Sequence, residues 1–189
     1  GSPVPQEISV TDEEVEFYWV GTDARIAGTI VHRWLQALAE GRGSLDGGEI
    51  EAERKVTRRW LREMGLGDEL QPGIVERVEA ALDGVRRDPK GRWILEGDGH
   101  AEFALTGQVD GTIESVVLDR IRIDEQGVHW VIDYKTSTHE GGNLKGFLDA
   151  EVERYKPQLD KYASIYGAFA GTRPRCALYF PLLQEFVEV

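Results

Sequence analysis

The segment Val128–Lys135 constrains this chain more than any other, because it places Asp133 and Lys135 at the end of an otherwise apolar run that predicts a buried β-strand. Side chains two positions apart on a strand share a face, so Asp133 and Lys135 point one way and Tyr134 the other. Burying a charge is costly unless the charge is paired or binds a metal ion. A carboxylate that can hold a divalent cation, beside an ammonium group that can stabilise an anionic transition state, suits phosphodiester hydrolysis. The three residues alone leave open a simpler interpretation, in which both charges reach solvent at a strand end.

A second alternating segment, Ser115–Asp124, carries another carboxylate and is expected to pair with the first. The loop between them, Glu125–Gly127, suits a type I turn closed by a left-handed glycine. Counting back from such a three-residue loop places Asp119 opposite Asp133, where Cβ atoms lie about 4.5–5.5 Å apart. Strict alternation would give Asp119 the same face as three apolar residues: Val117, Ile121 and Ile123. A two-residue loop would shift this register and separate the two carboxylates.

The composition indicates a single globular domain without a membrane span. The chain has 189 residues, of which 41% are hydrophobic and 30% charged, and it contains no apolar run long enough to cross a bilayer. Residues 1–20 are expected to be a polar lead-in that starts with a tag remnant, Gly1 and Ser2, and residues 21–189 the domain. No signal peptide is expected. The single cysteine, Cys176, excludes an internal disulfide and a four-thiolate iron–sulfur cluster, and points to a reducing compartment.

The order of the expected elements predicts an α/β fold of α+β-like character, with a mixed β-sheet flanked by helices and extra helices at the N-terminal end. Apolar spacing, proline and glycine positions predict helices over Asp23–Glu40, Glu49–Met64, Pro72–Arg87 and Pro157–Phe169. Alternation predicts strands over His100–Thr106, Gln108–Glu114, Val116–Ile123, Val128–Lys135 and Arg175–Leu182. A polar loop is expected over Thr136–Lys145.

The net charge of −12 argues against strong electrostatic capture of nucleic acid by this chain alone. The basic residues are nevertheless clustered in two groups: Arg54, Lys55, Arg58, Arg59 and Arg62; and Arg86, Arg87, Lys90 and Arg92. Each group is as well explained by a solvated helix face as by a binding surface.

Four further side chains are candidates for a site or its support. His32 lies on the first helix, and Gly28 lies one turn earlier on the same face. A helical glycine costs about 1 kcal/mol, so Gly28 indicates close approach by another backbone or a ligand, although a lone histidine is more often structural. Gln158 and Tyr162 are spaced i, i+4 and could grip phosphate, sugar or a base edge, or could belong to an ordinary amphipathic helix. Glu102 could support the site from the first strand.

Other chemistries lack their motifs in this sequence. There is no phosphate-binding loop for ATP, no dinucleotide fingerprint, no zinc-ligand pairing and no nucleophile elbow.

Together these residues resemble the RecB-type nuclease domain of the PD-(D/E)XK superfamily, which forms the C-terminal part of UvrD-like helicase-nucleases such as RecB and AddA. Four segments carry the resemblance in order, over about residues 21–182: Gly28–Leu35, Gly107–Arg120, Asp133–Ser137 and Gln158–Tyr162. No single segment is specific, but their order and spacing are. The resemblance implies a restriction-endonuclease-like core.

The resemblance also implies the roles of the candidate residues. Four groups are expected to bind Mg²⁺ or Mn²⁺: His32, Asp119, Asp133 and the backbone carbonyl of Tyr134. Lys135 is expected to be essential for the chemistry, and Gln158 and Tyr162 to support catalysis or hold DNA. Gln36 stands where relatives often carry Glu, which should leave metal binding intact.

The resemblance finally implies a biological setting, a DNA exonuclease or endonuclease in the bacterial cytoplasm. Its substrate is expected to be single strands fed by an ATP-dependent helicase motor in recombinational repair, as in exodeoxyribonuclease V. The helicase domains, and a second helicase-nuclease subunit, are the expected partners. Two alternatives remain open, a catalytically inactive nuclease-like module that binds DNA or docks a partner, and a module in which metal binding is only structural.

Overall fold

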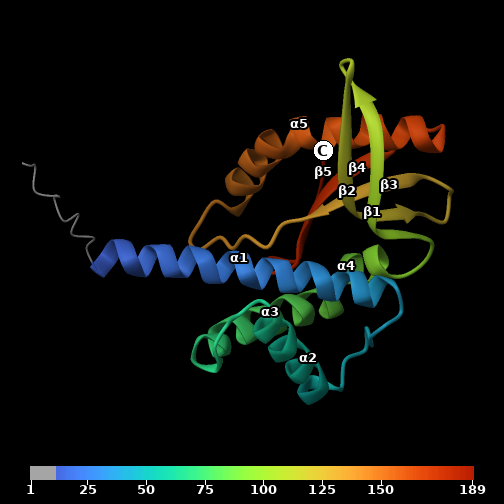
Figure 1. Ribbon diagram of the computed structural model, residues 1–189. Coiled ribbons are helices and arrows are strands. Elements are labelled where there is room, and N and C mark those ends of the chain that lie inside the picture. Colours follow the sequence, from blue (N-terminus) through green and yellow to red (C-terminus); the bar gives the residue numbers. More distant parts are fainter. Residues whose placement is uncertain (1–11) are drawn as a thin grey trace, which may run out of the picture.

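A computed structural model describes residues 12–189, with side chains from residue 21 onward; the expected tag remnant lies outside the described residues. The chain forms a mixed β-sheet with helices on both faces (Figure 1). One core cluster lies between the sheet and the N-terminal helices, and a second lies between the sheet and the last helix. The predicted α/β fold class, with extra N-terminal helices, is therefore confirmed.

The N-terminal half of the described chain is helical. Its helices are α1 Asp12–Ala39, α2 Ile50–Glu63, the 3-10 turn η1 Asp68–Leu70, α3 Gln71–Arg87 and α4 Pro89–Leu95. α1 begins earlier than expected and includes residues assigned to the lead-in. α4 was not predicted, because Pro89 was interpreted only as a stop. Asp88 caps α4 by accepting a hydrogen bond from Lys90 N at 3.0 Å, and Pro89 suits the first helical position.

The sheet has the order β1-β2-β3-β4-β5. The strands are β1 Gly99–Val109, β2 Thr112–Ile123, β3 His129–Tyr134, β4 Arg175–Phe180 and β5 Glu185–Glu188. Only the β3–β4 pair is parallel, and the other pairs are antiparallel. β5 was not predicted, because its four residues are too short to show a clear alternation.

One expected strand was wrong. Residues Gln108–Glu114 span a hairpin, because Val109 pairs with Thr112 across Asp110 and Gly111. Both turn residues have positive φ, 48° and 81°, as a type I′ turn requires. Asp-Gly is the strongest local signal for this turn, and it joins β1 and β2 into one long hairpin whose tip projects past α5 (Figure 1).

The β2–β3 hairpin has the predicted register. Gly127 closes the loop with φ 77°, and Asp124 N donates to Val128 O at 2.9 Å. The ladder runs to Arg120 opposite Ile132, so its continuation places Asp119 opposite Asp133.

The strict alternation expected along β2 was wrong. Leu118 and Ile121 both belong to the cluster that packs against α5, although they are three positions apart and so should point to opposite faces, and Val117 is half exposed. The irregularity lies where Glu102 of β1 faces Asp119, and Glu102 has φ 48°, which is unusual for a residue other than glycine. The break frees the Asp119 carboxylate from the regular faces of the sheet.

α5 spans Leu144–Ala170 and so begins thirteen residues before the expected start at Pro157. Asn143 caps it by accepting a hydrogen bond from Gly146 N at 3.1 Å, and Gly171 ends it in the left-handed conformation. Pro157 sits inside the helix, where it removes a backbone donor. The helix continues because apolar residues on both sides of Pro157, such as Val152 and Leu159, pack against the same cluster.

None of the helices in residues 12–189 combines the length and the apolar character needed to span a bilayer.

Candidate active site

A cavity of about 610 Å³ opens between α1 and the irregular part of the β1–β2 pair. Its walls carry nine residues: Arg25, Gly28, Thr29, His32, Arg33, Gln36, Glu102, Asp119 and Thr136. Two of the predicted metal ligands therefore face one cavity, together with the glutamate that was expected to support them.

His32 and Asp119 are in direct contact. His32 Nε2 lies 3.2 Å from Asp119 Oδ2, and His32 Nδ1 lies 2.9 Å from the carbonyl oxygen of Gly28, one turn earlier on α1. Burial opposes a charge on the imidazole, but the hydrogen bond and the charge of Asp119 raise the pKa of His32 to about 9. Asp119 also accepts a hydrogen bond from the backbone N–H of Tyr134 at 2.8 Å. Although burial works against ionisation, these contacts hold the pKa of Asp119 below its usual value.

Asp133 and Lys135 form a buried ion pair at the end of β3. Lys135 Nζ lies 2.8 Å from Asp133 Oδ2, and the two side chains are 17% and 9% exposed. Burial, and next the charge of Asp119, raise the pKa of Asp133 to about 6. Despite the ion pair, Asp133 Oδ2 makes no hydrogen bond of good geometry within the described part of the chain. Such a buried carboxylate oxygen can accept a further ligand.

The Lys135 ammonium lies between this carboxylate and an aromatic ring. Its Nζ is 3.6 Å from the centroid of the Tyr155 ring on α5. The negative face of the ring attracts the cation, and such a contact contributes about 2 kcal/mol where it is desolvated. Lys135 is therefore held from the sheet and from α5 together.

Gly28 permits the close approach of α1 to the end of β3. A Cβ atom at position 28 would lie 2.7 Å from Thr136 Oγ1. Gly28 was expected to allow close approach by another backbone or a ligand; the group that approaches it is instead the side chain of Thr136. Arg77 of α3 donates a hydrogen bond to the carbonyl oxygen of Thr136 at 3.3 Å, which ties the residue after Lys135 to the helical layer.

Gln158 and Tyr162 lie one turn apart on α5, and Gln158 Nε2 donates to the Tyr162 hydroxyl at 2.9 Å. Burial, and next the charges of Asp133 and Asp119, raise the pKa of Tyr162. Gln158 Oε1 is buried and lacks a hydrogen bond among the described residues.

The predicted residues thus form three pairs: His32 with Asp119, Lys135 with Asp133, and Gln158 with Tyr162. In residues 21–189, no group of three or more His, Cys, Asp or Glu side chains is spaced as the ligands of one ion. The donor types are nevertheless those that suit a hard divalent cation, mostly carboxylate oxygens with one imidazole.

Sequence reasoning missed three residues of this region, Tyr155, Thr136 and Arg77. Tyr155 precedes Gln158 by three positions, so it shares that face of the helix, but the late start assigned to α5 excluded it. Nothing local marks Thr136 or Arg77, since their contacts join elements far apart in the sequence.

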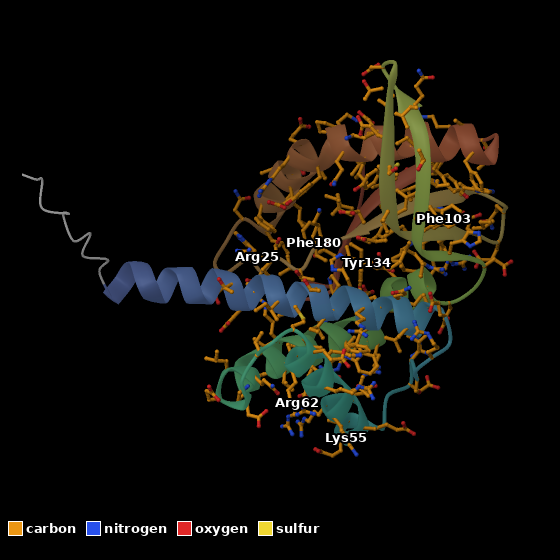
Figure 2. The ribbon with its side chains drawn as sticks, in the orientation of Figure 1. Arg25, Lys55, Arg62, Phe103, Tyr134 and Phe180 are labelled. Atoms are coloured by element: carbon orange, nitrogen blue, oxygen red, sulfur yellow. The ribbon has the colours of Figure 1, made fainter. Side chains whose placement is uncertain are left out.

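The two basic clusters behave differently. Arg86 pairs with Glu53 and donates to Ser44 O at 2.9 Å, while Arg92 donates to Leu45 O at 2.9 Å. The second cluster therefore fastens the segment between α1 and α2. In the first cluster, Lys55, Arg58, Arg59 and Arg62 are exposed on α2. Figure 2 shows Lys55 and Arg62 on the outer side of α2, away from the labelled Tyr134.

Comparison with known families gives one match. A family model described as PD-(D/E)XK nuclease superfamily matches residues 20–187, which include all the side chains of the candidate site. No curated protein matches the chain significantly.

Proposed function

The chain belongs to the PD-(D/E)XK nuclease superfamily, and from this membership we propose that it is a metal-dependent deoxyribonuclease that hydrolyses phosphodiester bonds. The observation that carries the proposal is the ion pair of Lys135 with Asp133 beside the hydrogen bond of His32 with Asp119. It combines the Lys135 ammonium with two carboxylates and His32 in one partly buried region, and phosphodiester hydrolysis uses such a cation beside carboxylates that can hold a metal ion.

The groups that would hold Mg²⁺ or Mn²⁺ are His32, Asp119, Asp133 and the backbone carbonyl of Tyr134. The buried Oδ2 of Asp133 supports this assignment: it pairs with Lys135 but makes no hydrogen bond of good geometry in the described part of the chain, so it can accept a hard cation. When bound, the ion would neutralise charge on the phosphate and make a water molecule more acidic.

Lys135 supplies the second part of the chemistry. Asp133 and the Tyr155 ring fix its ammonium group, so that it can donate a hydrogen bond to the attacking water or to a phosphate oxygen. Its positive charge offsets the negative charge that grows on phosphorus-bound oxygens during in-line attack. Gln158 and Tyr162 border the same region and can hold the phosphate or the sugar of the strand.

We further propose that the substrate is a DNA strand delivered in single-stranded form by an ATP-dependent helicase motor, in recombinational repair. The order of the four RecB-like sequence segments supports this setting, and a second helicase-nuclease subunit belongs to it.

A cleavage assay tests the proposed activity. The chain is incubated with end-labelled single-stranded DNA and with Mg²⁺ or Mn²⁺, and a parallel reaction contains EDTA. We expect metal-dependent shortening of the label, and its loss in Asp133→Asn and Lys135→Met. The matched controls are Asp149→Asn and Lys145→Met, because these residues form an exposed pair of the same types at 2.6 Å on α5. The controls should cleave as the unmodified chain does.

Two outcomes would contradict the proposal. Binding of DNA without cleavage under any metal condition would indicate an inactive nuclease-like module. Binding of Mn²⁺ that stabilises the chain, without DNA binding or cleavage, would indicate a structural metal site.

A further inference from the structure

One face of α1 carries a polar row beside the candidate active site. Arg25, Thr29, His32 and Gln36 are spaced i, i+4, i+7 and i+11, so they share a face of the helix, and all four line the cavity. Arg33 flanks the row and lines the same cavity. We refer to Arg25 and Arg33 as the arginine ridge; the hydroxyl of Thr29, which lies between them, donates to the carbonyl oxygen of Arg25 at 3.2 Å.

The two arginines of this ridge are available to a ligand. Arg25 is exposed and makes no ion pair within the described part of the chain. Arg33 stacks over the Trp60 ring at 4.2 Å, which orients its guanidinium. Its acidic neighbour, Glu63, lies 3.7 Å away, and both side chains are about half exposed (49% and 55%). Exposed pairs of this kind contribute little, so Glu63 does not prevent Arg33 from binding another anion.

The positive charge of the ridge offsets the negative charge of the candidate active site. The floor of the cavity carries Asp119 and Glu102, and the whole chain has a net charge of −12. This field repels a polyanion unless positive charge lies close to the place where the phosphate must sit. In the cavity wall, that charge comes from Arg25 and Arg33, on the helix that also carries His32. Figure 2 shows Arg25 on the side of α1 that faces the sheet and α5.

We propose that Arg25 and Arg33 bind the backbone phosphates of a DNA strand next to the bond to be cleaved. This inference rests on the proposed function, since it assumes that the scissile phosphate lies at His32 and Asp119. Eight residues of helix from Arg25 to Arg33 span about 12 Å. At about 3.4 Å per stacked nucleotide, the ridge would accompany roughly three to four phosphates.

Salt-dependent DNA binding tests the ridge separately from cleavage. A fluorescein-labelled oligothymidylate is titrated with the full chain in EDTA, and the dissociation constant is measured by anisotropy over a series of salt concentrations. For single strands, each lost phosphate contact should reduce the slope of log K against log [salt] by about 0.7. Arg25→Ala/Arg33→Ala should therefore flatten the slope by about 1.4 and weaken binding at low salt. Arg25→Lys/Arg33→Lys should keep most of the slope.

The matched control is Lys55→Ala/Arg62→Ala, which removes the same charge from the outer side of α2. Its slope should equal that of the unmodified chain. Three results would overturn the inference. They are an unchanged slope in the ridge variant, an equal loss of slope in the control, and no binding of the single strand or of a duplex by the unmodified chain. Circular dichroism confirms that each variant is folded.

A duplex of the same length forms the second arm of the experiment. A slope change with the single strand supports a single-stranded source of the phosphates, and a change seen only with the duplex assigns the ridge to double-stranded DNA. Because EDTA excludes metal-dependent cleavage, a ridge effect in a chain that never cuts DNA would refute the proposed nuclease while leaving the ridge as a binding site.

Discussion

Replacing Gly28 by alanine tests the closest packing contact of the candidate site. In an unobstructed helix interior, Gly→Ala stabilises a protein by about 0.5–1 kcal/mol. At position 28, however, the new Cβ would lie 2.7 Å from Thr136 Oγ1, and Gly28 is buried. Overpacking of this kind costs about 1–3 kcal/mol. The steric term should win, so Gly28→Ala should lower the free energy of unfolding by about 0.5–2 kcal/mol.

Gly21→Ala is the matched control, because Gly21 lies on the same helix and its Cβ would meet no atom within 4 Å. It should raise the free energy of unfolding by about 0.5–1 kcal/mol, which corresponds to roughly 1–4 °C in melting temperature for a chain of this size. Urea unfolding measures both variants.

A double variant identifies the cause. In Gly28→Ala/Thr136→Ala the clashing Oγ1 is gone, so the two substitutions should be non-additive by about 1 kcal/mol or more. Gly28→Ala should also reduce cleavage, because the displaced Thr136 directly follows Lys135. If Gly28→Ala stabilised the chain as much as Gly21→Ala does, the close approach of α1 to the end of β3 would be refuted.

Three further predictions concern ionisable groups. In the metal-free protein the pKa of His32 is raised to about 9 and that of Asp133 to about 6. At pH 7 binding of Mn²⁺ must therefore displace about one proton, chiefly from His32, and the affinity for Mn²⁺ should rise as the pH increases toward 9. Calorimetry in buffers of different ionisation enthalpy measures this release, and its absence would contradict His32 as a ligand. Burial raises the pKa of the Cys176 thiol to about 11. Iodoacetamide at pH 8 should therefore label the native chain about a hundred-fold more slowly than the chain unfolded in urea. Equal labelling rates would contradict the burial of this thiol. Tyr179→Phe removes a 2.8 Å hydrogen bond to Asp88 and should lower the free energy of unfolding, measured in urea, by about 2 kcal/mol. A decrease of less than about 0.5 kcal/mol would show that this hydrogen bond does not stabilise the fold.

The sequence predicted well what short-range geometry determines. Turn chemistry around Gly127 was sufficient to set the β2–β3 register, which is observed as far as Arg120 opposite Ile132; Asp119 and Asp133 follow directly after this pair. Alternation then correctly gave Tyr134 to one core cluster and Val131 to the other. Such inferences succeed because a hairpin with a defined loop leaves the chain almost no freedom in pairing.

Contacts between distant parts of the chain determined the features that local sequence patterns failed to predict. Pro157 is an unfavourable helix residue, but the apolar contacts of α5 with the sheet outweigh its cost, so the helix starts at Leu144. The same error hid Tyr155, whose ring holds the Lys135 ammonium. A contact between two residues twenty positions apart, one directly after a strand and one on a helix, has no signature in local spacing.

The break in alternation at Asp119 connects the fold to the proposed chemistry. On a regular strand, alternation counted from Ile121 would place Asp119 on the α5 face, whereas alternation counted from Leu118 would place it on the opposite face. In the structure its carboxylate meets both His32 and the Tyr134 N–H. The left-handed backbone of Glu102, directly across the pair, accompanies the irregularity that makes both contacts possible. Strained residues of this kind persist where the surrounding structure compensates for them, and they cluster at functional sites.

Glu102→Gly should therefore relax the backbone, and it should not lower the free energy of unfolding. It would remove a carboxylate from the cavity at the same time, so comparison with Glu102→Gln in the cleavage assay would separate the backbone effect from the charge effect. Equal stability of the two variants would contradict strain at this position.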